Sequence, residues 1–256
     1  MKRLYTGVFT LIFSTTVLAQ TAIIPDRSFS NVIETKSPQI SSKLFSHFMG
    51  VKSDFSGQTL QETYSELNDF VRHLDQRMQK SRSTEQFLRY LFYRVHRTYL
   101  KDYQSYTTLN DILSDGAYDC VSATALYALL LEALHIDFSI QEMTYHVYLE
   151  IPVGNEVVLL ESTDPLAGFV AGSGKVAERL AQYRSEEVDQ TMYSRPIQAQ
   201  VGITELIGLT YYNAAINYYN QQQLVPARQH LKQAIQWYPV DRMYALQALI
   251  ESVATR

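Results

Sequence analysis

The sequence predicts an α+β protein, with N-terminal helices, a central helix packed on an antiparallel sheet, and a C-terminal helical hairpin. Apolar residues recur every three or four positions over 59–99 and again after residue 203, which is typical of amphipathic helices. The stretch 117–136 is apolar on nearly every side, as a buried helix is. Two β-rich runs follow at 143–151 and 156–163, and the first alternates apolar and polar residues. Strands flanked by helices on both sides along the chain indicate a mixed fold.

The first residues predict export. Lys2 and Arg3 precede a short, mostly apolar run at 8–17, and a small-residue pattern ends at Ala19. We predict a signal peptide that is cleaved after Ala19, with Gln20 as the mature N-terminus, and therefore a periplasmic or secreted protein. The run is shorter than the about 20 apolar residues that a membrane anchor needs. An uncleaved amphipathic start is the alternative.

The charge balance disfavours nucleic acid as a partner. The chain has 22 Lys and Arg against 26 Asp and Glu. Without Lys2 and Arg3, the mature chain has 20 against 26, a net charge of 20 − 26 = −6. Phosphate binding needs a basic face, which this balance does not supply. No later run approaches the length of a membrane span, so we predict no transmembrane segment in the mature chain.

The predicted organisation has four parts. They are the signal peptide at 1–19, a loose leader at 20–56, an α+β domain at 57–195, and a helical tail at 196–256 that begins at Pro196. The leader is rich in Ser, Thr, Pro and Asn and has room for one short helix near 44–49. Helices are expected over about 59–78 and, after an N-cap at Ser83, as far as Tyr99. A charged helix is expected over about 176–183.

Cys120 is the only cysteine, so it has no partner for an internal disulfide. Asp119 is a good N-cap residue, which places Cys120 in the first turn of the predicted buried helix. The free N–H groups and the dipole of a helix N-terminus favour the thiolate, the form in which a cysteine is nucleophilic. The sequence therefore indicates a nucleophile at Cys120, and the alternative is an inert buried thiol.

His146 lies on the polar face of the first predicted strand and is a candidate base for Cys120. Glu161 and Asp164 compete to orient its ring. If Gly154-Asn155 is a two-residue turn, the numbers of paired residues sum to 309, and Glu161 shares the face of His146 on a diagonal of about 7–8 Å. Asp164 would then point to the other face, and a loop one residue longer or shorter would reverse this preference. We predict Glu161 as the third catalytic residue, with Asp164 as the alternative.

Three motifs follow one another between about residues 110 and 165. A cysteine opens the buried helix in DCVSATALYALLLEALHI, a histidine precedes an aromatic-x-Glu pattern in YHVYLEI, and an acid-x-Thr pattern follows in LLEST. In this order, the motifs resemble those of the transglutaminase-like superfamily. The resemblance implies a papain-like α+β core and thiol chemistry on amide or acyl bonds, with Cys120, His146 and Glu161 as the catalytic residues.

The chain departs from the pattern of that superfamily at three points. Glu161 stands where aspartate is more common, Tyr148 stands where tryptophan is common, and no glycine closely follows Cys120. A carboxylate can orient an imidazole from either side-chain length, so the chemistry is not blocked. An oxyanion also needs hydrogen-bond donors, and the backbone N–H of Cys120 is one candidate. Candidates for the second donor are Gln104, Asn110 and Tyr118.

The other histidines do not form a metal-binding pattern. They are His47, His73, His96, His135 and His230. The sequence has neither an H-x-x-x-H pair nor a cysteine cluster. The GSG motif around Gly172 lacks the following Lys-Ser/Thr and the preceding strand of a phosphate-binding loop. We therefore predict no metal and no cofactor.

Alanines, two larger apolar residues and a final proline are spaced in the tail at characteristic intervals. They are Ala215, Tyr218, Ala227, Leu231, Ala234 and Pro239. In these intervals, residues 208–240 resemble one tetratricopeptide repeat, capped by a third helix over 242–253. A single repeat cannot bury its own apolar face, so we expect it to pack on the preceding domain and to offer a surface to a protein partner. A plain hairpin used only for packing is the alternative.

Together these patterns predict an exported cysteine-dependent hydrolase or acyltransferase that acts on amide bonds of a peptide or protein substrate. The alternative is a catalytically inactive protein of the same fold that serves as a protein-interaction module in the envelope. The reactivity of Cys120 distinguishes the two hypotheses.

Overall fold

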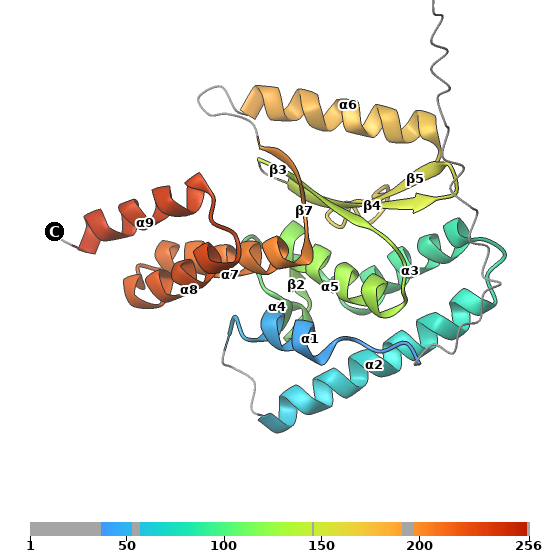
Figure 1. Ribbon diagram of the computed structural model, residues 1–256, viewed down its shortest axis with the longest axis horizontal. Helices are drawn as coiled ribbons and strands as arrows, with labels where there is room; N and C mark the ends of the chain where they lie inside the picture. The colour runs from blue at the N-terminus through green and yellow to red at the C-terminus, as the bar shows by residue number, and fades with distance from the viewer. Residues whose placement is uncertain (1–36, 53–56, 145, 191–196, 255–256) are drawn as a thin grey trace, which may run out of the picture. The chain divides into compact units, whose positions relative to one another are not determined.

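The computed structural model describes residues 37–52, 57–144, 146–190 and 197–254 (Figure 1). These residues belong to one compact unit that begins at Val32. The predicted signal peptide, most of the predicted leader and Pro196 lie outside the described residues, so cleavage after Ala19 stays a prediction. None of the helices in the described ranges combines the length and the apolar character that a bilayer crossing needs.

The described part of the chain begins with three helices, as the sequence predicts. They are α1 (Ser42–Met49), α2 (Gly57–Gln79) and α3 (Thr84–Thr98). Ser83 caps α3, where its hydroxyl accepts a hydrogen bond from the Gln86 N–H at 3.2 Å. The short helix expected near 44–49 is confirmed as α1, and its Phe45 and Phe48 are buried.

The central helix α5 (Cys120–Ala133) is buried nearly all round, which confirms the expectation from its apolar sequence. Just before it, the chain forms α4 (Leu109–Ser114) and a small parallel pair of β1 (Asp102–Tyr103) and β2 (Ala117–Tyr118). These three elements were not predicted, because each has six residues or fewer and shows no periodicity.

A five-stranded antiparallel sheet follows α5 in the described part of the chain. Its strands are β3 (Ser139–Met143), β4 (His146–Val153), β5 (Glu156–Leu160), β6 (Phe169–Val170) and β7 (Gln198–Val201), in the order β6-β5-β4-β3-β7. The prediction of one strand over 143–151 is wrong in its bounds, because Met143 ends β3 and His146 begins β4. Strands β6 and β7 were not predicted, and neither was β3 as a strand of its own.

The register of the central hairpin agrees with the sequence arithmetic. Leu149 pairs with Leu160, and Val153 pairs with Glu156, so the paired numbers sum to 309. Gly154 has a φ of +60°, a left-handed conformation that glycine adopts without a steric cost. The two-residue turn at Gly154-Asn155 is therefore confirmed, and with it the alternation of faces along β4 and β5.

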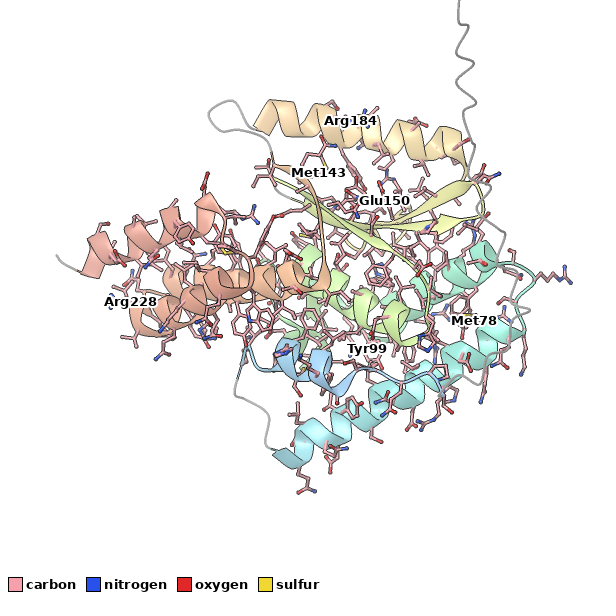
Figure 2. All side chains as sticks on the ribbon, viewed as in Figure 1. Met78, Tyr99, Met143, Glu150, Arg184 and Arg228 are labelled. Carbon is pink, nitrogen blue, oxygen red and sulfur yellow. The ribbon has the colours of Figure 1, made fainter. Side chains whose placement is uncertain are left out.

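Helices cover both faces of the sheet (Figure 1). On one face, α5 packs against Val147, Leu149 and other side chains of the main core, and the Thr124 hydroxyl reaches the Val147 carbonyl at 3.4 Å. On the other face lies α6 (Ser173–Gln190), whose Val176 packs in a smaller cluster with Tyr148 and Met143. Figure 2 shows Met143 between the sheet and α6. Cys120 begins α5, His146 begins β4, and Glu161 directly follows β5.

Three helices end the chain. They are α7 (Ile203–Asn220), α8 (Leu224–Trp237) and α9 (Asp241–Ala254). α7 packs against α8 and against α5, and β7 just before it joins the sheet. At Gly208, an added Cβ would lie 2.6 Å from Tyr238 Cβ, so α7 and α8 approach closely there. The structure confirms an α+β fold with an antiparallel sheet and C-terminal helices.

Candidate active site

Cys120 is the first residue of α5, and a reciprocal cap holds it there. The Asp119 carboxylate accepts from the Ser122 N–H at 2.8 Å, and the Ser122 hydroxyl accepts from the Asp119 N–H at 2.9 Å. The two capping N–H groups, of Asp119 and Ser122, flank Cys120 and Val121 in the sequence. The backbone N–H groups of Val121 and of Val147, the second residue of β4, lie close enough to the thiol to affect its pKa. The thiol therefore lies near the start of β4.

The environment keeps the resting thiol neutral. Burial raises the pKa of Cys120, and the charges of Asp119 and Glu161 raise it further. The N–H groups of Val147 and Val121 act in the opposite direction without outweighing burial. The side chain is half-buried. A nucleophilic Cys120 thus needs a base that takes its proton as attack begins.

His146 and Glu161 form a hydrogen-bonded pair beside Cys120. His146 is the first residue of β4, and Glu161 follows the last residue of β5. The Nε2 atom of His146 hydrogen-bonds Oε2 of Glu161. This leaves Nδ1 as the ring nitrogen that can exchange a proton with a thiol. The arrangement matches the role that a third polar group plays when it orients a catalytic imidazole.

The carboxylate of Glu161 is buried but well satisfied, with 4 % of its side chain exposed. Its Oε1 accepts from the Thr163 N–H at 2.8 Å and from the Thr163 hydroxyl at 2.5 Å. Burial alone would raise the pKa of Glu161, but the hydrogen bond and charge of His146 and the two Thr163 donors outweigh it and lower the pKa. Glu161 is therefore ionised at neutral pH.

Asp164 faces a different set of partners. Its Oδ1 accepts from the backbone N–H groups of Leu166 at 3.2 Å and Ala167 at 2.8 Å. Its Oδ2 lies 3.6 Å from the Arg179 guanidinium. The structure brings His146 together with Glu161, and it gives Asp164 a place in the loop after β5.

A cavity of about 800 Å³ adjoins the pair. Cys120 and His146 both line it. One side comes from the strand ends and the segment before α5, and the other comes from the C-terminal helices. Lining residues from α7 and α9 are Leu209, Tyr212, Asn213, Ile216, Asp241, Arg242 and Ala245. The predicted helical tail therefore forms one wall of the cavity that Cys120 lines.

The comparisons with known proteins found nothing similar. No protein-family model, no curated protein and no solved structure matches this chain.

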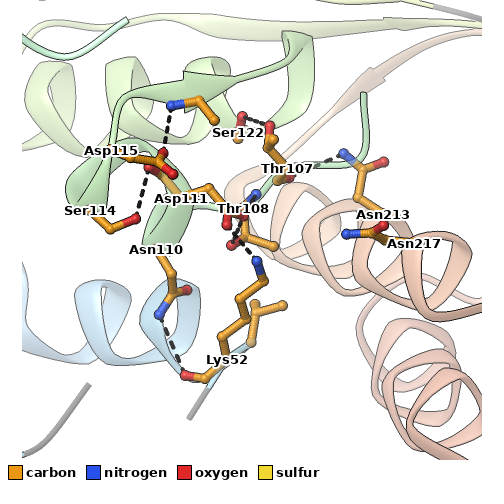
Figure 3. A network of polar contacts seen from close by, with 12 residues as sticks. Lys52, Thr107, Thr108, Asn110, Asp111, Ser114, Asp115, Ser122, Asn213 and Asn217 are labelled. Carbon is orange, nitrogen blue, oxygen red and sulfur yellow. Dashed lines mark hydrogen bonds and ion pairs between the residues drawn. The ribbon is translucent and has the colours of Figure 1, made fainter. Parts of the chain in front are cut away.

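The start of α5 is also held from the tail. The Asn213 amide of α7 donates to Asp119 Oδ2 at 2.6 Å, and the Tyr106 N–H donates to the same oxygen at 2.9 Å. Burial raises the pKa of Asp119 to about 6, although the donors around it act in the opposite direction. Figure 3 shows Asn213 reaching the Thr107 carbonyl, and the Thr107 hydroxyl hydrogen-bonded to Ser122 at 2.9 Å. A polar network thus supports the first turn of the Cys120 helix.

The candidates for a second oxyanion donor do not line the cavity. Gln104 donates to Asp102 at 3.0 Å, and the Asn110 amide donates to the Met49 carbonyl at 3.1 Å. Tyr118 is buried, with its ring 6.0 Å from that of Tyr103. None of these three side chains therefore lines the cavity beside Cys120.

Tyr103 does line the cavity, and the sequence analysis missed it. Tyr103 is 55 % exposed, and partial burial, followed by the charge of Cys120, raises the pKa of its hydroxyl. The hydroxyl therefore stays protonated, as an oxyanion donor must. No sequence signal pointed to it, because the strand that holds it has only two residues.

In the described ranges, no group of three or more His, Cys, Asp or Glu side chains gathers as a metal site requires.

Proposed function

We propose that this chain is a cysteine-dependent hydrolase or acyltransferase of the transglutaminase-like kind, with a papain-like core, that acts on amide bonds of peptides or proteins. The observation that carries the proposal is the hydrogen bond between His146 Nε2 and Glu161 Oε2, together with a cavity that His146 and Cys120 both line. The cavity, of about 800 Å³, has room for a segment of peptide.

In this mechanism, the Cys120 sulfur attacks the substrate carbonyl while His146 takes the thiol proton. The C–N bond then breaks, and His146 gives that proton to the leaving amine. Water hydrolyses the thioester in a hydrolase, and a second amine replaces water in an acyltransferase. Glu161 holds the ring of His146 and stabilises its charged form. The N–H of Cys120 and the hydroxyl of Tyr103 are the candidate donors to the oxyanion.

The neutral resting thiol gives the proposal a specific test. Because Cys120 is the only cysteine, alkylation by iodoacetamide reports on this sulfur alone. At pH 7 the wild-type thiol is expected to react about tenfold or more faster than in His146→Gln, since the imidazole assists removal of the proton. His73→Gln on α2 is the matched control, because His73 is exposed and bonds only its own helix at Asp69.

Equal alkylation rates in the wild-type chain and His146→Gln would contradict the proposal. A panel of fluorogenic peptide amides, with Cys120→Ala as the negative control, then identifies the bonds that are cleaved or transferred. We also propose that the protein acts outside the cytoplasm, on the basis of residues 1–19. N-terminal sequencing of the exported protein should begin at Gln20, and retention of Met1 would contradict this.

A second candidate function is an inactive interaction module in the envelope, with a tetratricopeptide-like tail. The raised pKa of Cys120 favours it, as does an apolar groove of about 330 Å³ between α8 and α9, lined by Leu231, Ile235 and Ile250. On this hypothesis, Cys120→Ala leaves the biological function intact, and His146→Gln leaves the alkylation rate unchanged.

A further inference from the structure

The Glu161 carboxylate receives a further donor from outside the sheet. The hydroxyl of Tyr183, on α6, donates to Oε2 at 2.9 Å, the same oxygen that His146 binds. The Tyr183 ring lies 5.3 Å from the His146 ring and 5.2 Å from the Tyr148 ring, measured between centroids. Tyr183 therefore contacts both members of the His146–Glu161 pair.

Tyr183 is in turn held by charged groups. Burial raises the pKa of Tyr183, and the Glu161 charge raises it further, so the hydroxyl remains a donor. The Arg179 guanidinium, one turn earlier on α6, lies over the Tyr183 ring, 5.9 Å from its centroid. Arg179 also donates to the Ala167 carbonyl at 3.3 Å and pairs with Asp164 at 3.6 Å.

These contacts connect α6 with the loop after β5 at two places. Arg179 contacts Asp164 and Ala167 within the loop, and Tyr183 donates to the Glu161 carboxylate at its start. A glutamate has one more rotatable bond than an aspartate, so more rotamer freedom must be removed to hold its carboxylate in one place. With the two donors from Thr163 and the one from His146, Tyr183 completes the set that holds the group.

We propose that Tyr183 and Arg179 are positioning residues of the active site, which hold the Glu161 carboxylate, and through it the His146 ring, in the orientation that serves Cys120. This inference rests on the proposed function. Under it, α6 is part of the catalytic machinery and has a purpose beyond covering the sheet. Asp164 acts through Arg179 in the same network.

The test substitutes Tyr183→Phe, which removes the hydroxyl and keeps the ring. The rate of Cys120 alkylation by iodoacetamide is measured from pH 4 to pH 10. We expect a rate at pH 7 about three- to tenfold below wild type, the effect of losing one typical intramolecular hydrogen bond. Tyr64→Phe is the matched control, since its hydroxyl donates to the Ile40 carbonyl at 2.7 Å, in a contact with the N-terminal segment.

The pH profile separates positioning from a general loss of stability. A donor to a carboxylate favours its charged form, so loss of the Tyr183 hydroxyl raises the pKa of Glu161, and the acidic limb of the profile moves to higher pH. Charged or titratable groups near Glu161 are His96 on α3, Cys120 on α5, Tyr103 and Tyr118 before it, His146 on β4, Asp164 in the loop and Arg179 on α6. Tyr183→Phe leaves all of them in place.

Two further variants complete the test. Arg179→Gln should lower the rate in the same direction as Tyr183→Phe. In a Glu161→Gln background, Tyr183→Phe should have no further effect, because both changes remove the same interaction. Thermal unfolding of each variant is compared with that of Tyr64→Phe, so that a folding defect is recognised.

Each outcome bears on the inference. A Tyr183→Phe protein with the wild-type rate and pH profile overturns it while the proposed function stands. An independent, additive effect in the Glu161→Gln background also overturns it. A wild-type thiol that reacts no faster than in His146→Gln overturns the proposed function and this inference together.

Discussion

Gly168 is the residue at which a single methyl group should do most harm to the candidate site. The loop from Glu161 to Gly168 is closed by two backbone hydrogen bonds of 2.8 Å, from the Glu161 N–H to the Gly168 carbonyl and from the Gly168 N–H to the Asp164 carbonyl. An added Cβ at Gly168 would lie 2.0 Å from the Glu161 carbonyl oxygen and 2.5 Å from that of Asp164. Both obstacles are backbone atoms, which cannot move aside by changing rotamer.

The size of the effect follows from these distances. Ordinary contact begins at 3.4 Å, so the Glu161 carbonyl and the new methyl must separate by 3.4 − 2.0 = 1.4 Å. Overpacking of this kind costs about 1–3 kcal/mol of folding free energy. A displacement near 1 Å at a catalytic group can lower the rate by about a hundredfold. We expect Gly168→Ala to lower stability moderately and to lower Cys120 alkylation at pH 7 by about tenfold or more, since Glu161 moves with its backbone.

Urea denaturation gives the stability of Gly168→Ala, and iodoacetamide labelling gives the reactivity. Gly174→Ala is the control, because an added Cβ at Gly174 meets nothing within 4 Å. It should match the wild-type protein in both measurements. A Gly168→Ala protein with wild-type stability and wild-type labelling would refute the argument that the loop fixes Glu161.

Two other predictions concern buried charges beside the cavity. Burial raises the pKa of Asp119 from 3.8 to about 6. A carboxyl group whose pKa is higher in the folded state contributes stability at low pH, and this stability is lost as the pH rises. Relative to Asp119→Asn, the wild-type protein should therefore lose roughly 3 kcal/mol of folding free energy between about pH 3.5 and pH 7. Urea denaturation at both pH values measures this, and a pH-independent difference contradicts it. Arg242→Ala leaves the buried Glu142 carboxylate with the Tyr238 hydroxyl at 2.7 Å but without its ion pair. It should cost roughly 2–4 kcal/mol, less than a fully buried pair because Arg242 is 23 % exposed, and addition of Glu142→Gln should restore most of it in thermal unfolding; a stable single variant would refute this.

Local sequence signals predicted the start of α5 and the register of the β4–β5 hairpin, although Glu161 lies just after β5 and not inside the strand predicted over 156–163. Asp119 before an apolar run fixed the start of α5, and Ser83 did the same for α3, because N-caps depend on a few neighbouring residues. The turn at Gly154-Asn155 set the hairpin register, and with it the face that Glu161 shares with His146. The catalytic role of Cys120, His146 and Glu161 stays a prediction, but the proximity of His146 and Glu161 could be derived from the hairpin register.

The errors have a common physical origin in nonlocal pairing. Residues 143–151 alternate without a break, so nothing in the pattern separated Met143 at the end of β3 from His146 at the start of β4. Strand β7 pairs with β3 over more than 50 residues of sequence, and β6 has only two residues. Strands of this kind exist because a partner strand is present, and periodicity within the segment does not reveal them.

Contacts between distant parts of the chain also account for the site residues that were not predicted. Tyr183 and Asn213 lie on helices whose sequences resemble those of any packing helix, and no motif distinguishes a tyrosine that packs from one that donates to a carboxylate of the candidate site. Each acts on a group far from it in sequence: Tyr183 on Glu161, Asn213 on Asp119. The three motifs span under a quarter of the chain, yet the groups that hold the Glu161 carboxylate and the cap of the Cys120 helix come from α6 and α7. A fragment that ended soon after the third motif would keep every residue that the sequence marks as catalytic and lose the side chains that hold two of the site's carboxylates in place. The candidate site is therefore a property of the whole compact unit, and the C-terminal helices belong to it.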